Sequence, residues 1–112
     1  IMAAVAAPKI FDKMSDAKES STKQSLAVVR SAIEMYRVEH AEDANPYPAD
    51  LTTDLTAYMK GSFPKCEVLD DAEVEVKTGT TALAVDATSA KSWLYNSDTG
   101  EIRINHADYI AW

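Results

Sequence analysis

Residues 1–40 read IMAAVAAPKIFDKMSDAKESSTKQSLAVVRSAIEMYRVEH and decide the fold. Residues 1–7 are apolar on every face, which is typical of a helix buried in protein or lipid. From Pro8 onward, apolar residues recur at intervals of three and four, the spacing of one helix face. The stretch therefore predicts one long helix of roughly 60 Å at about 1.5 Å per residue. A compact chain of this size has a radius of gyration of only about 13 Å, so one end should project.

The apolar run at residues 1–7 leaves two interpretations open. It is either part of a buried core helix or the remnant of a truncated membrane helix, since a bilayer span takes about 20 apolar residues. We expect that residues upstream of Ile1 are missing, because the chain begins inside this run. Pro8 is either a kink between a membrane stem and a soluble helix, or the first residue of the helix, where its missing N–H costs nothing. The residues expected to form the kink and the assembly surface of the stem are Ile1, Val5 and Pro8.

The second half of the long helix is expected to supply the core of a globular head. Its apolar face carries Leu26, Val29, Ile33 and Tyr36. We expect the helix to span residues 8–41 and to end before Pro46 and Pro48, which impose extended backbone. Residues 42–112 would then form the head of a single domain that spans residues 1–112.

After the prolines the pattern changes from helical to alternating. A short second helix is expected at Leu51, Leu55, Tyr58 and Met59. Four strand candidates follow, each marked by two apolar residues two positions apart: Val74 and Val76, Leu83 and Val85, Trp93 and Tyr95, Ile102 and Ile104. Residues 93–96 and 101–105 should form an antiparallel hairpin, because residues 96–100 tolerate a tight turn.

This order of elements predicts an α+β fold. We expect the long N-terminal helix to pack on a small C-terminal antiparallel sheet, with the short helix between them. The residues of the sheet expected in the core are Trp93, Tyr95, Ile102 and Ile104.

Charge is distributed unevenly along the chain. Residues 9–41 hold six basic and five acidic residues, whereas residues 42–112 hold five basic and thirteen acidic residues. An acidic head repels phosphate backbones, so we expect no nucleic-acid partner. The composition, 46% hydrophobic and 26% charged, is that of an ordinary globular domain.

The chain offers no recognisable catalytic or metal-binding pattern. Its three glycines lie too far apart for a phosphate-binding loop. Cys66, His40 and His106 are too few for a structural zinc site, and Cys66 has no disulfide partner. The acidic residues considered for calcium are Glu67, Asp70, Asp71, Glu73, Asp98 and Asp108. Calcium takes about six to eight oxygens from a shaped loop, and no loop motif in this sequence supports calcium binding. We therefore expect no cofactor. Because no catalytic pattern is recognisable, we also expect that the protein is not an enzyme.

Three stretches resemble bacterial pseudopilins. They are the alanine-rich run of residues 1–10, the Tyr47-Pro48 run with Leu51 and Leu55, and WLYNSDTGEIRIN at residues 93–105. Together they are similar to the G-type, or major, pseudopilins of type II secretion systems, within the type IV pilin superfamily. The tight turn at residues 96–100 stands where the G-type group has a long calcium-binding loop. Cys66, standing alone, departs from the paired cysteines of many type IV pilins.

The resemblance implies a structural subunit for protein secretion. It implies a prepilin N-terminal helix that is processed and methylated upstream of Ile1, an anchor in the inner membrane, and a head in the periplasm. Assembly through the helix would build a periplasmic pseudopilus from copies of this chain and other pseudopilins, on an inner-membrane assembly platform. Two alternatives remain: a type IV pilin for adhesion or DNA uptake, and a soluble protein-binding module with an N-terminal partner helix.

Overall fold

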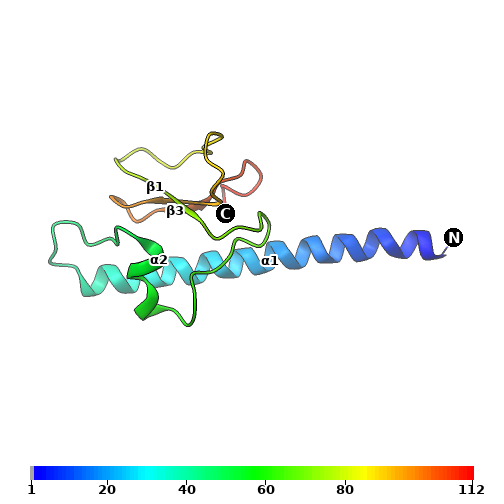
Figure 1. The fold of residues 1–112 in the computed structure, drawn as a ribbon, viewed down its shortest axis with the longest axis horizontal. Coiled ribbons are helices and arrows are strands. Elements are labelled where there is room, and N and C mark those ends of the chain that lie inside the picture. Colours follow the sequence, from blue (N-terminus) through cyan, green and yellow to red (C-terminus); the bar gives the residue numbers. More distant parts are fainter. Residues whose placement is uncertain (1) are drawn as a thin grey trace.

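The structure is a computed structural model that describes the backbone of residues 2–112 and the side chains of residues 16–112. It combines one long helix with a small three-stranded sheet, which confirms the α+β class. Helix α1 (Met2–Glu39) runs past the sheet and beyond it, and the molecule measures 64 × 30 × 18 Å (Figure 1). The Cα radius of gyration is 16.4 Å, which exceeds the value of about 13 Å for a compact chain of this size. One end of α1 therefore projects.

The C-terminal half of α1 forms the helical side of the core. Leu26, Val29 and Ile33 are at most 2% exposed, and Tyr36 packs half-buried against the same cluster. The buried position nearest the projecting end, among the described side chains, is Thr22. Its hydroxyl donates to the carbonyl of Lys18 and accepts the amide of Val68. The buried hydroxyl of Thr22 is therefore fully hydrogen-bonded at the point where the head meets the helix.

Helix α1 ends at Glu39, two residues earlier than expected. The expected second helix is present as two short turns, α2 (Leu51–Asp54) and the 3-10 turn η1 (Thr56–Tyr58). Asp50 caps α2, because its carboxylate accepts the amide of Thr52 at 3.1 Å. Leu51 and Leu55 are buried by these turns, whereas Tyr58 and Met59 remain half-buried.

The sheet has the order β1-β2-β3, with β1 at Val74–Lys77, β2 at Trp93–Asn96 and β3 at Ile102–Ile104. Strands β2 and β3 form the predicted antiparallel hairpin. Strands β1 and β2 are parallel, so the expectation of a wholly antiparallel sheet is wrong. Parallel neighbours need a crossover connection. Residues 78–92 supply it, on the side of the sheet away from α1 (Figure 1).

The strand expected at Leu83 and Val85 is also wrong, since this stretch belongs to the crossover. Its main chain bonds to side chains rather than to a neighbouring strand. The amide of Leu83 donates to a carboxylate oxygen of Glu101 at 3.1 Å, and the amide of Asp86 donates to the side chain of Asn105 at 2.8 Å. Val85 is 42% exposed. An alternating pattern here therefore marks extended backbone without a strand partner.

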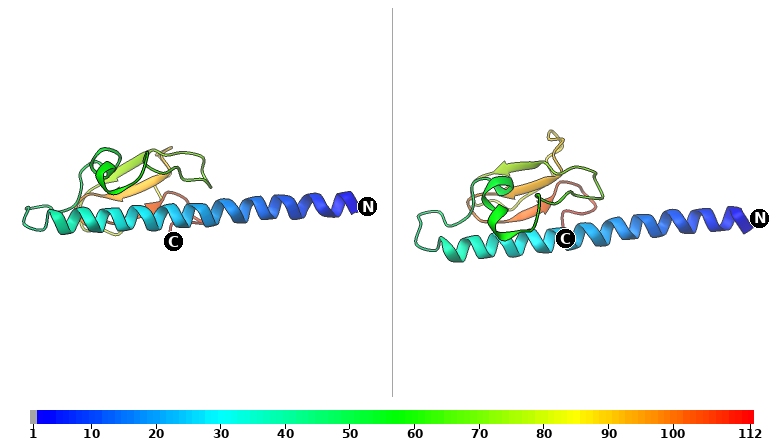
Figure 2. Two further views of the ribbon diagram at one scale, coloured as in Figure 1. Left: turned by 90° about the horizontal axis from the view of Figure 1, so that it is seen from below. Right: turned by 60° about the horizontal axis from the view of Figure 1, so that its bottom comes forward.

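The core lies between α1 and the sheet (Figure 2). Trp93 is fully buried, its indole N–H donates to the carbonyl of Pro64 at 3.2 Å, and its ring meets Phe63 edge to face. Tyr95 is also fully buried, and its hydroxyl donates to the carbonyl of Pro48 at 2.6 Å. Across the hairpin, Trp93 lies opposite Ile104 and Tyr95 opposite Ile102. The hairpin thus anchors both the core and the chain that leads into α2.

Gly100 closes the hairpin turn with a φ of +76°, and a Cβ at this position would overlap the ring of Tyr47. We expect Gly100→Ala to lower the free energy of unfolding by about 2 kcal/mol, through left-handed strain and overpacking together. Urea denaturation measures this loss. Gly79→Ala is the matched control, because Gly79 has a φ of +95° but open space around its Cβ position. Equal losses in the two variants would contradict the role assigned to Tyr47.

Candidate assembly surface

An apolar stripe lies on the face of α1 that points away from the sheet. It consists of Val28, Met35 and Val38, which are 48%, 51% and 66% exposed. Their spacing of seven and three residues puts them on one helix face. We call these three residues the outer stripe. Solvent-exposed apolar side chains gathered on one face are typical of an interaction surface.

The outer stripe borders a groove between α1 and η1. Three adjoining hollows of about 450, 310 and 380 Å³ run along it, and Tyr58 lines all three. The hydroxyl of Tyr58 donates to the carboxylate of Glu39, and this hydrogen bond raises the pKa of Tyr58 to about 12. The Tyr58 ring also meets Tyr36 edge to face. Tyr58 is therefore held in place as one wall of the groove.

Few charges interrupt this face. The exposed residues of α1 between Gln24 and Val38 include a single charged side chain, Glu34, which pairs with Arg37 at 2.8 Å. Small residues, Ala27 and Ser31, line the groove beside the stripe. A helix face with small and apolar residues allows close approach of another helix. This surface was not predicted from the sequence, although the spacing of the outer stripe is visible there.

Cationic side chains fasten the C-terminal segment to both α1 and β3. One guanidinium nitrogen of Arg30 donates to the carbonyls of Ile102 at 3.2 Å and Trp112 at 2.8 Å. Arg103 donates to the Trp112 carbonyl at 3.1 Å, and the Lys23 ammonium lies 4.7 Å from the centre of the Trp112 ring. Burial, together with the charge of Arg103, lowers the pKa of Arg30. These contacts connect the helix to one edge of the sheet.

Asn105 holds the crossover on β3. Its side-chain N–H groups donate to the carbonyls of Asp86, Ser89 and Lys91 at 3.1, 3.4 and 3.0 Å. The Asp86 carboxylate accepts the Lys77 ammonium at 2.6 Å, and hydrogen bonds from Lys77 and from Thr88 lower the pKa of Asp86 to about 2. A polar residue just after a strand gives no periodic signal, so the contacts of Asn105 with the crossover could not be predicted from the sequence.

Three of the six acidic residues considered for calcium, Asp70, Asp71 and Asp98, are engaged with protein donors. Asp71 accepts the amides of Ser92 at 2.9 Å and Glu73 at 3.2 Å. Asp98 accepts the amide of Gly79 at 2.7 Å, and Asp70 pairs with Lys65. Within residues 16–112, no three acidic, histidine or cysteine side chains form a group that could hold a metal ion. Asp71 and Asp98 therefore act as local caps, and Asp70 is an ion-pair partner of Lys65.

The two histidines and the cysteine lie in three separate places. His40 contacts the carbonyl of Tyr36 through Nδ1 at 2.8 Å and stacks on the Tyr36 ring. His106 lies in the C-terminal segment, 3.9 Å from Asp108. Cys66 is buried, and burial raises the pKa of its thiol, which keeps it in the unreactive protonated form.

The residues expected in the head core come together in the structure. Seven of the eight are buried, and the eighth, Tyr36, is half-buried beside them. Pro8 lies inside α1 and is not its first residue. Ile1 and the side chains of Val5 and Pro8 lie outside the described residues, so their role in a kink and in stem assembly stays a prediction.

A scan against protein-family models and comparisons with curated proteins and with solved structures gave no match. No helix of the described chain has the length and apolar character to cross a membrane. The function is therefore inferred from the shape and surfaces of the chain itself.

Proposed function

We propose that this chain is a structural subunit of a helical filament, the pseudopilus of a type II secretion system. The observation that carries this proposal is the projection of α1 from the head (Figure 1). Helix α1 has 38 residues, and Thr22 is its buried position nearest the projecting end among the described side chains. About half of the helix thus lies ahead of the head, a stem of about 30 Å at 1.5 Å per residue.

Such a stem can pack along α1 of a neighbouring copy while the acidic heads remain on the outside. Each copy then uses two different surfaces, and a contact of this kind that does not close generates a helical filament. The outer stripe supplies apolar surface beside the head for this packing. Before assembly, an apolar segment continuous with residues 1–7 holds the subunit in the inner membrane, with its head in the periplasm.

The test uses the full-length protein in its own bacterium, with the secretion machinery overproduced. We expect the protein in the membrane fraction and in sheared filaments visible by electron microscopy. Met35→Asp places a charge on the outer stripe and should reduce the filament yield by about tenfold. This corresponds to a loss of roughly 1.4 kcal/mol in the free energy of each contact between subunits. Thr80→Asp is the matched control, because Thr80 is exposed on the crossover, away from α1.

Two outcomes would overturn the proposal. One is a full-length protein that stays in the soluble fraction as a monomer; the other is a gene that encodes a polar domain directly upstream of Ile1. A filament displayed on the cell surface that supports adhesion or DNA uptake would instead identify a type IV pilin.

A second candidate function is a protein-binding module, which the groove beside Tyr58 favours because the outer stripe lines it and it is open along its length. Its occupant would be an amphipathic helix of another protein. This function predicts that Met35→Asp abolishes binding of a helical partner in a chain that does not associate with itself. If the chain is a filament subunit instead, Met35→Asp should weaken the association of the chain with its own copies.

A further inference from the structure

The two edges of the sheet differ in how their main chain is covered. At the β3 edge, the carbonyl of Ile102 accepts the Arg30 guanidinium and the carbonyl of Ile104 accepts the amide of His106 at 2.9 Å. Caps of this kind protect an edge strand from pairing with another chain. The opposite edge is β1, whose neighbour in the sheet is β2 alone.

The outward main-chain groups of β1 belong to Val74 and Val76. The carbonyl of Glu73 accepts the amide of Trp93, and the carbonyl of Lys77 accepts the amide of Ser97. In a parallel ladder, alternate residues of a strand face the same neighbour. Residues 73, 75 and 77 therefore face β2, and the N–H and C=O groups of Val74 and Val76 point away from the sheet. No hydrogen bond among the described residues engages them.

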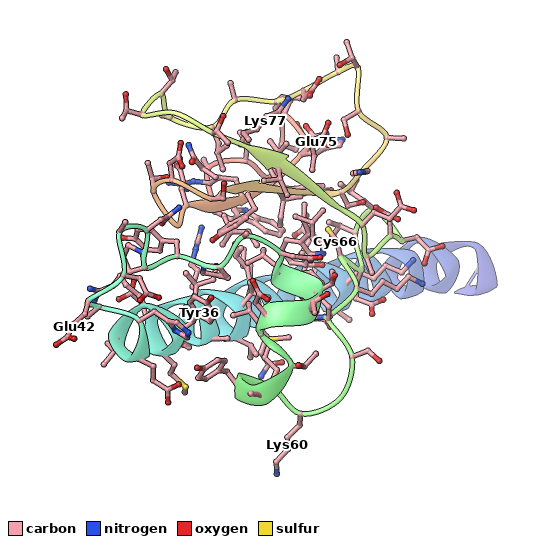
Figure 3. All side chains as sticks on the ribbon, turned by 60° about the vertical axis from the view of Figure 1, so that its left-hand side comes forward. Tyr36, Glu42, Lys60, Cys66, Glu75 and Lys77 are labelled. Atoms are coloured by element: carbon pink, nitrogen blue, oxygen red, sulfur yellow. The ribbon has the colours of Figure 1, made fainter. Side chains whose placement is uncertain are left out.

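The space beside this edge is open. A groove of about 490 Å³ separates β1 from the start of α2, and Val74, Val76 and Leu51 are among its lining residues. Val76 is 44% exposed there. Figure 3 shows Glu75 and Lys77 on the side of β1 away from α1 and α2. A further strand can thus lie along β1 with apolar residues toward α2 and charged residues on the other face.

We propose that β1 is a docking site for β1 of a second copy of this chain, paired antiparallel about a two-fold axis. The pairing is centred on Val76, which faces Val76 of the partner subunit and exchanges two main-chain hydrogen bonds with it. On the charged face, Glu75 lies opposite Lys77 of the partner subunit, and the same pair repeats across the axis.

The order of residues in β1, Val-Glu-Val-Lys, selects this partner and this direction. Opposite charges directly across an antiparallel pair are favourable, and like charges are unfavourable. A parallel, in-register pairing would set Glu75 against Glu75 and Lys77 against Lys77. Each charge already has a partner of its own, since Lys77 contacts Asp86 and Glu75 lies 3.8 Å from Lys91. The second copy therefore adds to an existing row of alternating charges.

The contact is isologous, so it closes at two copies and leaves no open edge at β1. It involves a strand of four residues, which makes the dimer weak and dependent on concentration. The projecting half of α1 takes no part in it. Head-to-head dimerisation is therefore separate from the filament proposed above, and either can fail without the other.

Charge reversal tests the pairing, with sedimentation equilibrium of the 112-residue chain as the measurement. Glu75→Lys sets lysines against each other across the axis, and Lys77→Glu sets glutamates against each other. Each variant alone should dimerise about tenfold more weakly than the parent chain. An equimolar mixture should form mixed dimers of about the parent affinity, because each lysine of one variant then faces a glutamate of the other. Circular dichroism of each variant verifies that it is folded.

Recovery in the mixture supports the two-fold β1 contact, since no single-chain effect of either substitution produces it. If one variant fails to fold, Val76→Pro replaces it, because proline at 76 removes an outward N–H without breaking a bond to β2. Val76→Pro should also dimerise about tenfold more weakly. A parent chain that stays monomeric at millimolar concentration, or a dimer unaffected by these changes, would overturn the proposal.

Discussion

Trp93→Ala is expected to lower the free energy of unfolding by about 3–5 kcal/mol, the usual cost of removing a large aromatic side chain from a core. Trp93 is fully buried on β2, between the facing Ile104 and the edge-on ring of Phe63. Its removal also frees the carbonyl of Pro64 from a hydrogen bond. Small domains have a total stability of about 5–15 kcal/mol, so this loss is a large part of what is available.

Urea denaturation followed by circular dichroism measures the loss, and Lys18→Ala is the control. Lys18 is exposed on α1, and the bond that it accepts from the Thr22 hydroxyl uses its carbonyl, which alanine retains. We expect this control to stay within about 0.5 kcal/mol of the parent. If both variants unfold at the same urea concentration, Trp93 does not anchor the core, and the WLYN stretch has another role.

The hairpin that contains Trp93 could be predicted from the sequence because the signals that form it are local. Apolar alternation marks both strands, and Gly100 has the positive φ that a tight turn between them requires. The helical side of the core was predictable for the same reason, since Leu26, Val29 and Ile33 follow the period of a helix. Each of these signals lies within the helix or hairpin that it predicts.

The direction of β1 could not be predicted in this way. An alternating strand has the same pattern whether its neighbour is parallel or antiparallel. Here the direction depends on the crossover at residues 78–92, whose contacts come from Glu101 and Asn105, residues that follow it in the chain. Single polar side chains of this kind have no period, so the pattern at Leu83 and Val85 was interpreted as a strand.

The two surfaces proposed for assembly, the outer stripe and the edge of β1, are also only partly predictable from the sequence. The outer stripe has a helical period, but its three residues were outnumbered by the core-facing positions on the same helix. The self-complementary order of charges in β1 is visible in the sequence, yet it has meaning only once β1 is known to be an edge strand. The sequence therefore contains both surfaces, and the topology is needed to recognise them.

Asn105→Ala is expected to lower the free energy of unfolding by about 2–4 kcal/mol, because one side chain makes four hydrogen bonds to the crossover and each contributes about 1 kcal/mol. Three are donated to the carbonyls of Asp86, Ser89 and Lys91, and one is accepted from the amide of Asp86. Asn45→Ala is the matched control. The Asn45 amide also bonds to main chain, donating to Ser97 and accepting from Tyr47, but it is exposed, so we expect a loss below about 1 kcal/mol.

Hydrogen exchange separates a local effect of Asn105 from a global one. The amide of Asp86 loses its acceptor in Asn105→Ala and should exchange at the rate of an exposed amide, whereas the amide of Trp93, which donates to the carbonyl of Glu73, should remain protected. This result would show that one side chain on the hairpin holds the connection required for β1 to lie parallel to β2. Unchanged protection of Asp86 would mean that the crossover is held by Lys77 and Glu101 instead, and that the parallel arrangement does not depend on Asn105.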